Sequence, residues 1–244
     1  MKLSIIIPVL ESHEIVRRQL LYLSRLIRYN QFTDLEVFFI DDGSEKPIVD
    51  YINKGDDFYF YKIRENLFRC YTENFYIFET HDKQPWSQPR AKNSVSKIIH
   101  GEYMLTTDID HILTAEALEN LLTQDFDKMI FSRKYGYLDY DGTVITERDK
   151  LFSLGYKNEY IDIEDVHSHT FCIKKSVFTD QLHGYDESYC GKYGHDDTEF
   201  HKRFNALNLT NVVNGGRMWV MSQDAIPLKG CWHNSPRNEM NIQP

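Results

Sequence analysis

A strand–helix–strand pattern at the start of the chain constrains the fold more than any other feature. Residues 2–9 form a short apolar run rich in β-branched side chains, which predicts a buried strand. After Ser12, a residue type that caps helices, residues 15–27 repeat apolar side chains at helical spacing. Residues 35–40 predict a second strand. This order predicts an α/β fold with a mostly parallel, Rossmann-like sheet, and such sheets bind ligands beyond the carboxyl ends of their strands.

Acidic residues follow two predicted strands of this sheet. Asp41 and Asp42 come directly after the second strand, and Asp108 and Asp110 follow a predicted turn and buried strand at residues 101–107. Mg²⁺ and Mn²⁺ prefer oxygen ligands and are often held by one or two carboxylates together with substrate phosphates. The Asp-X-Asp pair therefore indicates a divalent cation that carries a diphosphate.

Composition limits the classes of protein that need to be considered. A chain of 244 residues fits one large α/β domain or two joined lobes. The net charge of −9 argues against a nucleic-acid partner. No stretch approaches the roughly 18–20 apolar residues of a membrane span, and no signal peptide is evident. We therefore expect a cytoplasmic location, which is compatible with peripheral association with a membrane, and we expect the four scattered cysteines to be reduced.

The rest of the chain predicts further alternating elements. An aromatic segment at residues 64–86 is expected to be irregular, and a boundary near residue 113 would separate a nucleotide-sugar-binding half, 1–113, from an acceptor-binding and catalytic half, 114–244. The other predicted elements are strands at 58–63, 129–132 and 171–173, a hairpin at 137–145, and helices at 89–100, 115–122 behind Thr114, and 196–207.

Short motifs along the chain resemble family 2 glycosyltransferases of the GT-A fold. The motifs are residues 4–9, 41–44, 90–93 and 108–110, then 184–187 followed by 193–200. The last block is similar to the acceptor-side motif of inverting, galactosyltransferase-like members, and the resemblance covers about residues 2–205. It implies an inverting, metal-dependent transfer of a hexose or N-acetylhexosamine from a UDP-sugar to a saccharide or glycolipid acceptor, in the biosynthesis of surface glycans.

The resemblance also implies a nucleotide site. Asp41 and Asp42 would accept hydrogen bonds from uracil or ribose, Arg90 would face the base or the diphosphate, and Asp108 would contact the nucleotide as well. The first strand would contribute Pro8, Val9 and Glu11, although Leu10 and Glu11 replace the aromatic residue and Asn that the family usually has there. Residues 41–44 are equally suited to a turn and helix cap on any α/β protein.

The same resemblance implies a metal site for Mn²⁺ or Mg²⁺. Asp110, with Asp108 directly or through water, would hold the cation. His233 falls where related enzymes have a late His that closes the metal site; the alternative is a surface His on the C-terminal tail. His111 follows the pair and either reaches the metal or diphosphate, or lies in solvent or behind the ligands.

The acceptor side of the resemblance centres on a second acidic pair. Asp197 would be the general base that deprotonates the acceptor hydroxyl, and Asp196 would bind an acceptor hydroxyl beside Tyr193 and Gly194. Asp196 occupies a position where the family has Glu, so its side chain is one methylene shorter. The alternative is that Asp196, Asp197 and Glu199 only favour the helix N-terminus through its dipole.

Two other classes of protein remain as alternatives. Asp108 and Asp110 could belong to a haloacid-dehalogenase-like phosphatase, but Ile112 occupies a position where that motif has Thr or Val, and the motif normally lies near the N-terminus. The chain could also be a non-catalytic module that binds nucleotide sugars. An assay separates the two enzyme classes. A glycosyltransferase releases a nucleoside diphosphate from a sugar donor, whereas a phosphatase releases phosphate from a monoester.

Overall fold

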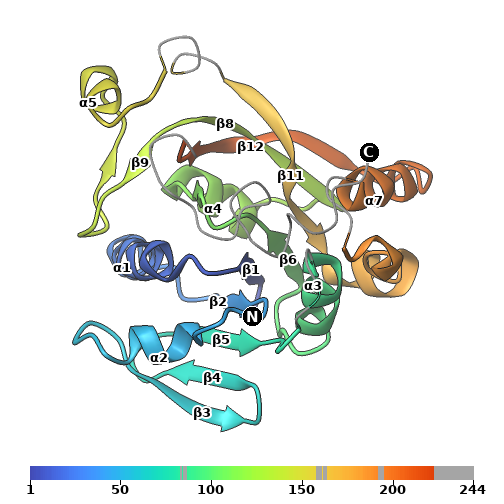
Figure 1. Ribbon diagram of the computed structural model, residues 1–244. Helices are drawn as coiled ribbons and strands as arrows, with labels where there is room; N and C mark the ends of the chain where they lie inside the picture. Colours follow the sequence, from blue (N-terminus) through green and yellow to red (C-terminus); the bar gives the residue numbers. More distant parts are fainter. Residues whose placement is uncertain (83, 85–86, 158–160, 162–163, 192–194, 223–244) are drawn as a thin grey trace.

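The computed structural model describes residues 1–222 except 83, 85–86, 158–160, 162–163 and 192–194 (Figure 1). Its centre is a ten-stranded sheet in the order β3-β4-β5-β2-β1-β6-β11-β8-β12-β7. The strands are β1 (Leu3–Val9), β2 (Leu35–Asp41), β3 (Phe60–Arg64), β4 (Leu67–Cys70), β5 (Phe75–Glu79), β6 (Tyr103–Thr106), β7 (His111–Ile112), β8 (Lys128–Tyr135), β11 (Asp165–Lys174) and β12 (Asn211–Val220).

The middle of the sheet is parallel and its flanks are mixed. Strand β1 pairs in parallel with both β2 and β6, and β2 pairs in parallel with β5. Strand β11 is antiparallel to β6 and β8, whereas β8 and β12 are parallel to each other. The carboxyl ends of β2 and β6 therefore lie at the same edge of the sheet, which brings the loops after Asp41 and after Thr106 to that edge.

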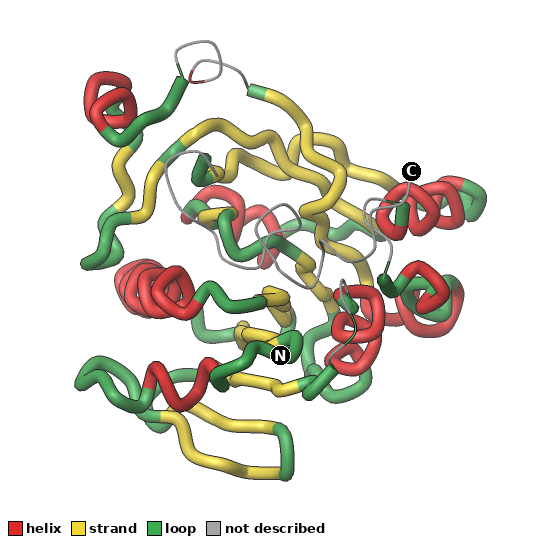
Figure 2. The backbone as a smooth tube through the Cα atoms, viewed as in Figure 1, coloured by secondary structure: helices red, strands yellow, loops and turns green. Residues whose placement is uncertain are grey.

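Helices cover both faces of the sheet, as Figure 2 shows. One face packs against α1 (His13–Asn30), α2 (Ile48–Ile52) and α4 (Ala115–Thr123) around a buried apolar core. The other face packs against α3 (Gln88–Ser96), the short helix Val177–Gln181 and α7 (Asp196–Asn205), with a second core of aromatic and aliphatic side chains. The alternation of side chains along the strands supplies both cores, because successive residues face opposite sides of the sheet.

The predicted aromatic segment at residues 64–86 differs clearly from its expected structure. Its described part is not irregular throughout, because β4 and β5 lie within it and extend the sheet beyond β2. Phe75 and Ile77 are buried in one core and Phe78 in the other, so the aromatic side chains are those of a strand covered on both faces. The turn between β3 and β4 lies at the carboxyl edge of the sheet, where the Glu79 N–H donates to the Asn66 carbonyl at 2.9 Å, and the loop after Glu79 starts at the same edge.

The other predicted elements are confirmed, most with small shifts of their ends, but β11 begins six residues before the predicted strand at 171–173, and β12 was not predicted. Thr114 caps α4, since its hydroxyl accepts a hydrogen bond from the Ala117 N–H at 3.1 Å. The hairpin is β9 (Tyr137–Leu138) and β10 (Val144–Ile145), and it packs with α5 (Arg148–Ser153) in a smaller apolar cluster beside α1. No helix in the described part of the chain is both long and apolar enough to cross a membrane. The division of the chain near residue 113 stays a prediction.

Candidate active site

The Asp-X-Asp pair lies on a sharp turn between β6 and β7. The Thr107 N–H still donates to the Ile6 carbonyl at 3.2 Å, and the His111 N–H closes the turn by donating to the Asp108 carbonyl at 3.1 Å. The Met221 N–H donates to the Asp110 carbonyl at 2.9 Å, so the chain just after β12 fixes the turn from the other side. Backbone hydrogen bonds on both sides thus hold the turn at the carboxyl edge of the sheet.

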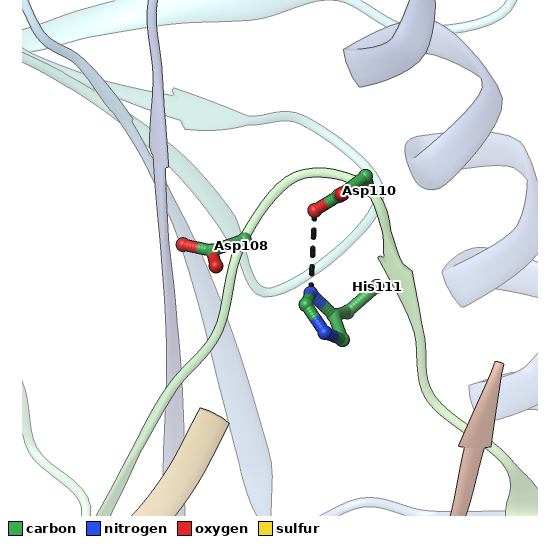
Figure 3. A group of neighbouring side chains, drawn as sticks. All are labelled: Asp108, Asp110 and His111. Atoms are coloured by element: carbon green, nitrogen blue, oxygen red, sulfur yellow. Dashed lines mark ion pairs between the residues drawn. The ribbon is translucent and has the colours of Figure 1, made fainter. Parts of the chain in front are cut away.

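Asp108, Asp110 and His111 form a group whose metal-binding atoms lie within 4.8 Å of one another (Figure 3). His111 Nδ1 lies 3.2 Å from Asp110 Oδ1, and the His111 ring is only 4% exposed. The expectation that His111 could lie in solvent is therefore wrong. Two carboxylates and an imidazole in this arrangement suit Mn²⁺ well, and they suit Mg²⁺ if the carboxylates are its main ligands.

The electrostatics of the turn also favour a bound cation. Burial raises the pKa of Asp108, and the nearby negative charges of Asp110 and Asp197 raise it further, while His111 and Lys92 oppose the shift. An ionised Asp108 is therefore costly in the protein without metal. A divalent cation would remove this cost by pairing with the carboxylates.

The second acidic pair begins α7 and faces the same site. Asp196 and Asp197 are buried, and burial together with the charge of Asp197 raises the pKa of Asp196. The Tyr185 hydroxyl donates to Asp197 Oδ1 at 2.9 Å, whereas Asp196 Oδ2 is buried without a hydrogen-bond partner among the described residues. An acidic side chain can stabilise a helix N-terminus while it is exposed to solvent. The helix dipole alone therefore does not explain why Asp196 and Asp197 are buried.

Sequence reasoning gave no role to Lys92, a buried cation that interacts with carboxylates of both acidic pairs. Lys92 lies on α3, is 2% exposed, and holds its Nζ 5.0 Å from the centroid of the Tyr185 ring. Its charge lowers the pKa of both Asp108 and Asp196. A signal was available: Lys92 lies three and four residues before the buried Val95 and Ser96, a spacing that puts it on the buried face of a helix.

Asn93 links the predicted donor and acceptor motifs. Its side-chain amide donates to the Tyr185 carbonyl at 2.9 Å and to Glu187 Oε1 at 3.0 Å, and its Oδ1 accepts from the Tyr185 N–H at 2.8 Å. Gly184 has φ +76°, and a Cβ there would lie 2.4 Å from Asn93 Oδ1. Only glycine fits this approach, which presses the segment carrying Tyr185 onto α3.

Asp41 and Asp42 already have protein partners at the end of β2. The two carboxylate oxygens of Asp41 accept from the N–H groups of Ser44 and Ile48, each at 2.9 Å, as the turn and helix-cap interpretation requires. Asp42 Oδ1 accepts from the Ser87 hydroxyl at 2.6 Å. Nucleotide binding by this pair stays a prediction.

Arg90 and Glu11 flank the same loops. Arg90 donates to Asp82 Oδ2 at 2.6 Å and to Glu187 Oε2 at 3.3 Å, which bridges the loop after β5 to the segment that follows Tyr185. Glu11 has φ 56°, its N–H donates to Ser44 Oγ at 3.0 Å, and its carboxylate accepts from the Glu45 N–H. These contacts join the loops after β1 and β2.

The other predicted nucleotide, acceptor and metal residues have no described contact with this site. Pro8 and Val9 are buried within β1 and pair with β2. Tyr193, Gly194 and His233 lie outside the described residues, so their predicted roles stay predictions.

Comparisons with known proteins identify the fold. The sequence matches no protein-family model and none of the curated proteins. Among solved structures, S. aureus TarS 1–349 in complex with UDP-GlcNAc shares 14% identity over 95% of this chain and 61% of that chain, with a TM-score of 0.60. The mannosyltransferase PcManGT from Pyrobaculum calidifontis, in complex with GDP-Man and Mn²⁺, shares 14% identity over 99% of this chain and 61% of that chain, with a TM-score of 0.53. The chain thus spans 61% of the length of each of these structures and has the GT-A fold.

Proposed function

We propose that the protein is an inverting, metal-dependent glycosyltransferase that moves a hexose or N-acetylhexosamine from a UDP-sugar to a saccharide or glycolipid acceptor in the cytoplasm, for surface glycan biosynthesis. One observation carries the proposal. The carboxylates of Asp108 and Asp110, which suit a metal, and those of Asp196 and Asp197, which suit an acceptor, interact within one buried site at the carboxyl edge of a GT-A sheet. Such an edge is where α/β sheets bind their ligands.

The donor half of the proposal rests on the turn after β6. Asp108, Asp110 and His111 would hold Mn²⁺ or Mg²⁺, which when bound stabilises negative charge on the leaving diphosphate. Lys92 would offset the negative charge of the surrounding carboxylates in the absence of donor. The complexes of TarS with UDP-GlcNAc and of PcManGT with GDP-Man and Mn²⁺ support a nucleotide-sugar donor for this fold.

The acceptor half rests on α7. Asp197 would take the proton of the acceptor hydroxyl, and the Tyr185 hydroxyl, which donates to Asp197 Oδ1, would hold that carboxylate in position. Asp196 Oδ2 has no hydrogen-bond partner among the described residues and would accept a hydrogen bond from an acceptor hydroxyl. A buried acceptor atom normally has a partner, so a ligand hydroxyl is a reasonable one.

The GT-A fold argues against the haloacid-dehalogenase-like phosphatase. The experiment below distinguishes an enzyme from a non-catalytic module that binds nucleotide sugars. The experiment screens UDP-sugars with Mn²⁺ by thermal shift and then assays UDP release with saccharide acceptors. We expect one donor to raise the Tm and to be turned over, and Asp110→Asn to lose both effects. Asp149→Asn, an exposed acid on α5, is the matched control and should retain them. Donor binding without turnover on any acceptor would favour the binding module instead.

A further inference from the structure

A polar cavity lies at the opposite edge of the sheet from the candidate active site. Strand β8 runs in the same direction as β6, because both are antiparallel to β11, so its first residue, Lys128, lies at the amino edge. The cavity has a volume of about 540 Å³. It is lined by Lys128, Ile130, Thr198, His201, Lys202, Asn205 and Asn211.

The lining of this cavity contains cationic and amide side chains and no carboxylate. The absence of carboxylates from this lining contrasts with the net charge of −9 of the whole chain. Lys202, the amides of Asn205 and Asn211 and the hydroxyl of Thr198 all provide hydrogen-bond donors. A donor-rich, positively charged cavity fits an oxyanion.

Lys128 is a buried cation without a counter-charge in the described part of the chain. The side chain is 3% exposed, and its Nζ lies 4.1 Å from the centroid of the Phe204 ring. Its polar contact is His201 Nδ1, at 3.1 Å, and no described carboxylate pairs with it. Burial lowers the pKa of Lys128 to about 8. Buried charges are ordinarily paired, so an anion would complete this site.

His201 lines the cavity beside Lys128. When the Lys128 ammonium donates to Nδ1, the neutral ring carries its proton on Nε2. The ring is held edge-on against Phe171, with centroids 5.0 Å apart. We infer that this cavity binds the phosphate group of a small molecule through Lys128 and Lys202. The inference is independent of the proposed function.

The test measures phosphate binding to the metal-free protein in EDTA at constant ionic strength. Isothermal titration calorimetry with inorganic phosphate should give saturable binding, and Lys128→Met and Lys202→Ala should each weaken it about tenfold or more. Asp110→Asn should leave it unchanged, because that residue belongs to the other edge of the sheet. Lys150→Ala removes an exposed lysine on α5 and is the matched control.

A thermal melt of each variant shows whether it is folded; if Lys128→Met does not fold, Lys202→Ala decides, since Lys202 is exposed. Absence of saturable binding to the wild type, or equal weakening by Lys150→Ala, would overturn the inference. Parallel titrations with pyrophosphate and a hexose 1-phosphate identify the source of the group. Tighter binding of the hexose 1-phosphate assigns the cavity to a phosphorylated sugar, and equal binding assigns it to free phosphate.

Discussion

Two acidic pairs follow strands of the same sheet, yet they are in opposite electrostatic states. Both oxygens of Asp41 accept backbone N–H groups, and Asp42 accepts from Ser87, so the charge at the end of β2 is stabilised locally. Asp108 at the end of β6 is instead half-buried near other carboxylates, and desolvation raises its pKa. The comparison indicates that the first pair builds a turn, whereas a cation would stabilise the charge of Asp108 in the second.

Asp196 and Asp197 belong with Asp108 in this comparison. The pKa of Asp196 is raised by burial and by Asp197, and one of its oxygens has no hydrogen-bond partner in the described chain. Carboxylates kept at such a cost often mark a functional site. Variants of the pairs should therefore affect different measurements, with stability dominating at Asp41 and ligand binding or turnover at the others.

The largest expected effect is on turnover by Asp197→Asn. The amide is nearly isosteric but cannot take a proton, so kcat should fall roughly 10²–10⁴-fold while UDP-sugar affinity stays nearly unchanged. Asp196→Asn should instead raise the acceptor KM, because it alters a contact and leaves the base intact. Steady-state kinetics and donor titrations measure both, with Asp149→Asn as control.

Near-normal turnover by Asp197→Asn on the true acceptor would contradict the inverting mechanism. A retaining or non-catalytic interpretation of the acid pair would then be preferred. Equal losses of kcat in both variants would also remove the distinction between base and acceptor contact.

A loss of stability is expected for Asp41→Ala. The N–H groups of Ser44 and Ile48 would lose their acceptors, and each buried donor left without one costs about 1–3 kcal/mol. Urea unfolding measures the change in the free energy of unfolding, and Asp110→Ala is the matched variant at the other strand end. If Asp41→Ala lowers the free energy of unfolding less than Asp110→Ala does, the structural role assigned to the first pair is wrong.

Removal of metal should weaken nucleotide binding. If the cation bridges Asp108 and Asp110 to the diphosphate, EDTA should remove this attraction and lower UDP affinity by about tenfold or more. A tenfold loss corresponds to about 1.4 kcal/mol of binding free energy. The measurement is a UDP titration with Mn²⁺ and with EDTA. Equal affinity in the two conditions would leave the Asp-X-Asp pair without its bridging role.

Asp108→Asn should stabilise the metal-free protein while abolishing metal binding. Burial raises the pKa of Asp108 above its ordinary value of 3.8, so the folded state binds the proton more tightly than the unfolded state. Its contribution to stability is therefore lost as pH rises from 3.8 through the raised pKa. The Tm advantage of the variant, measured in EDTA, should grow over this window. A constant difference between the two proteins across pH would contradict the raised pKa.

The sequence predicted most local elements but not how they meet. The cap at Thr114 was predictable because a cap depends on neighbours along the chain. Strands β4 and β5 were missed because an aromatic run without clear alternation shows its strand character only once both faces are covered. The site role of Lys92 was missed for a similar reason, since its partners Asp108 and Asp196 lie far away in sequence.

The smallest expected effect distinguishes two histidines that could serve the same metal. His111 already lies beside Asp110, at 3.2 Å, whereas His233 lies beyond the described residues. If His233 closes the site over bound donor, His233→Ala should raise the Mn²⁺ concentration needed for half-maximal transfer and leave the Tm of the donor-free protein unchanged. His111→Gln should weaken Mn²⁺ binding measured directly on the donor-free protein as well, because its imidazole belongs to the turn itself. A Mn²⁺ titration of His233→Ala that overlays the wild type would assign the nitrogen ligand to His111 and leave His233 as a tail residue.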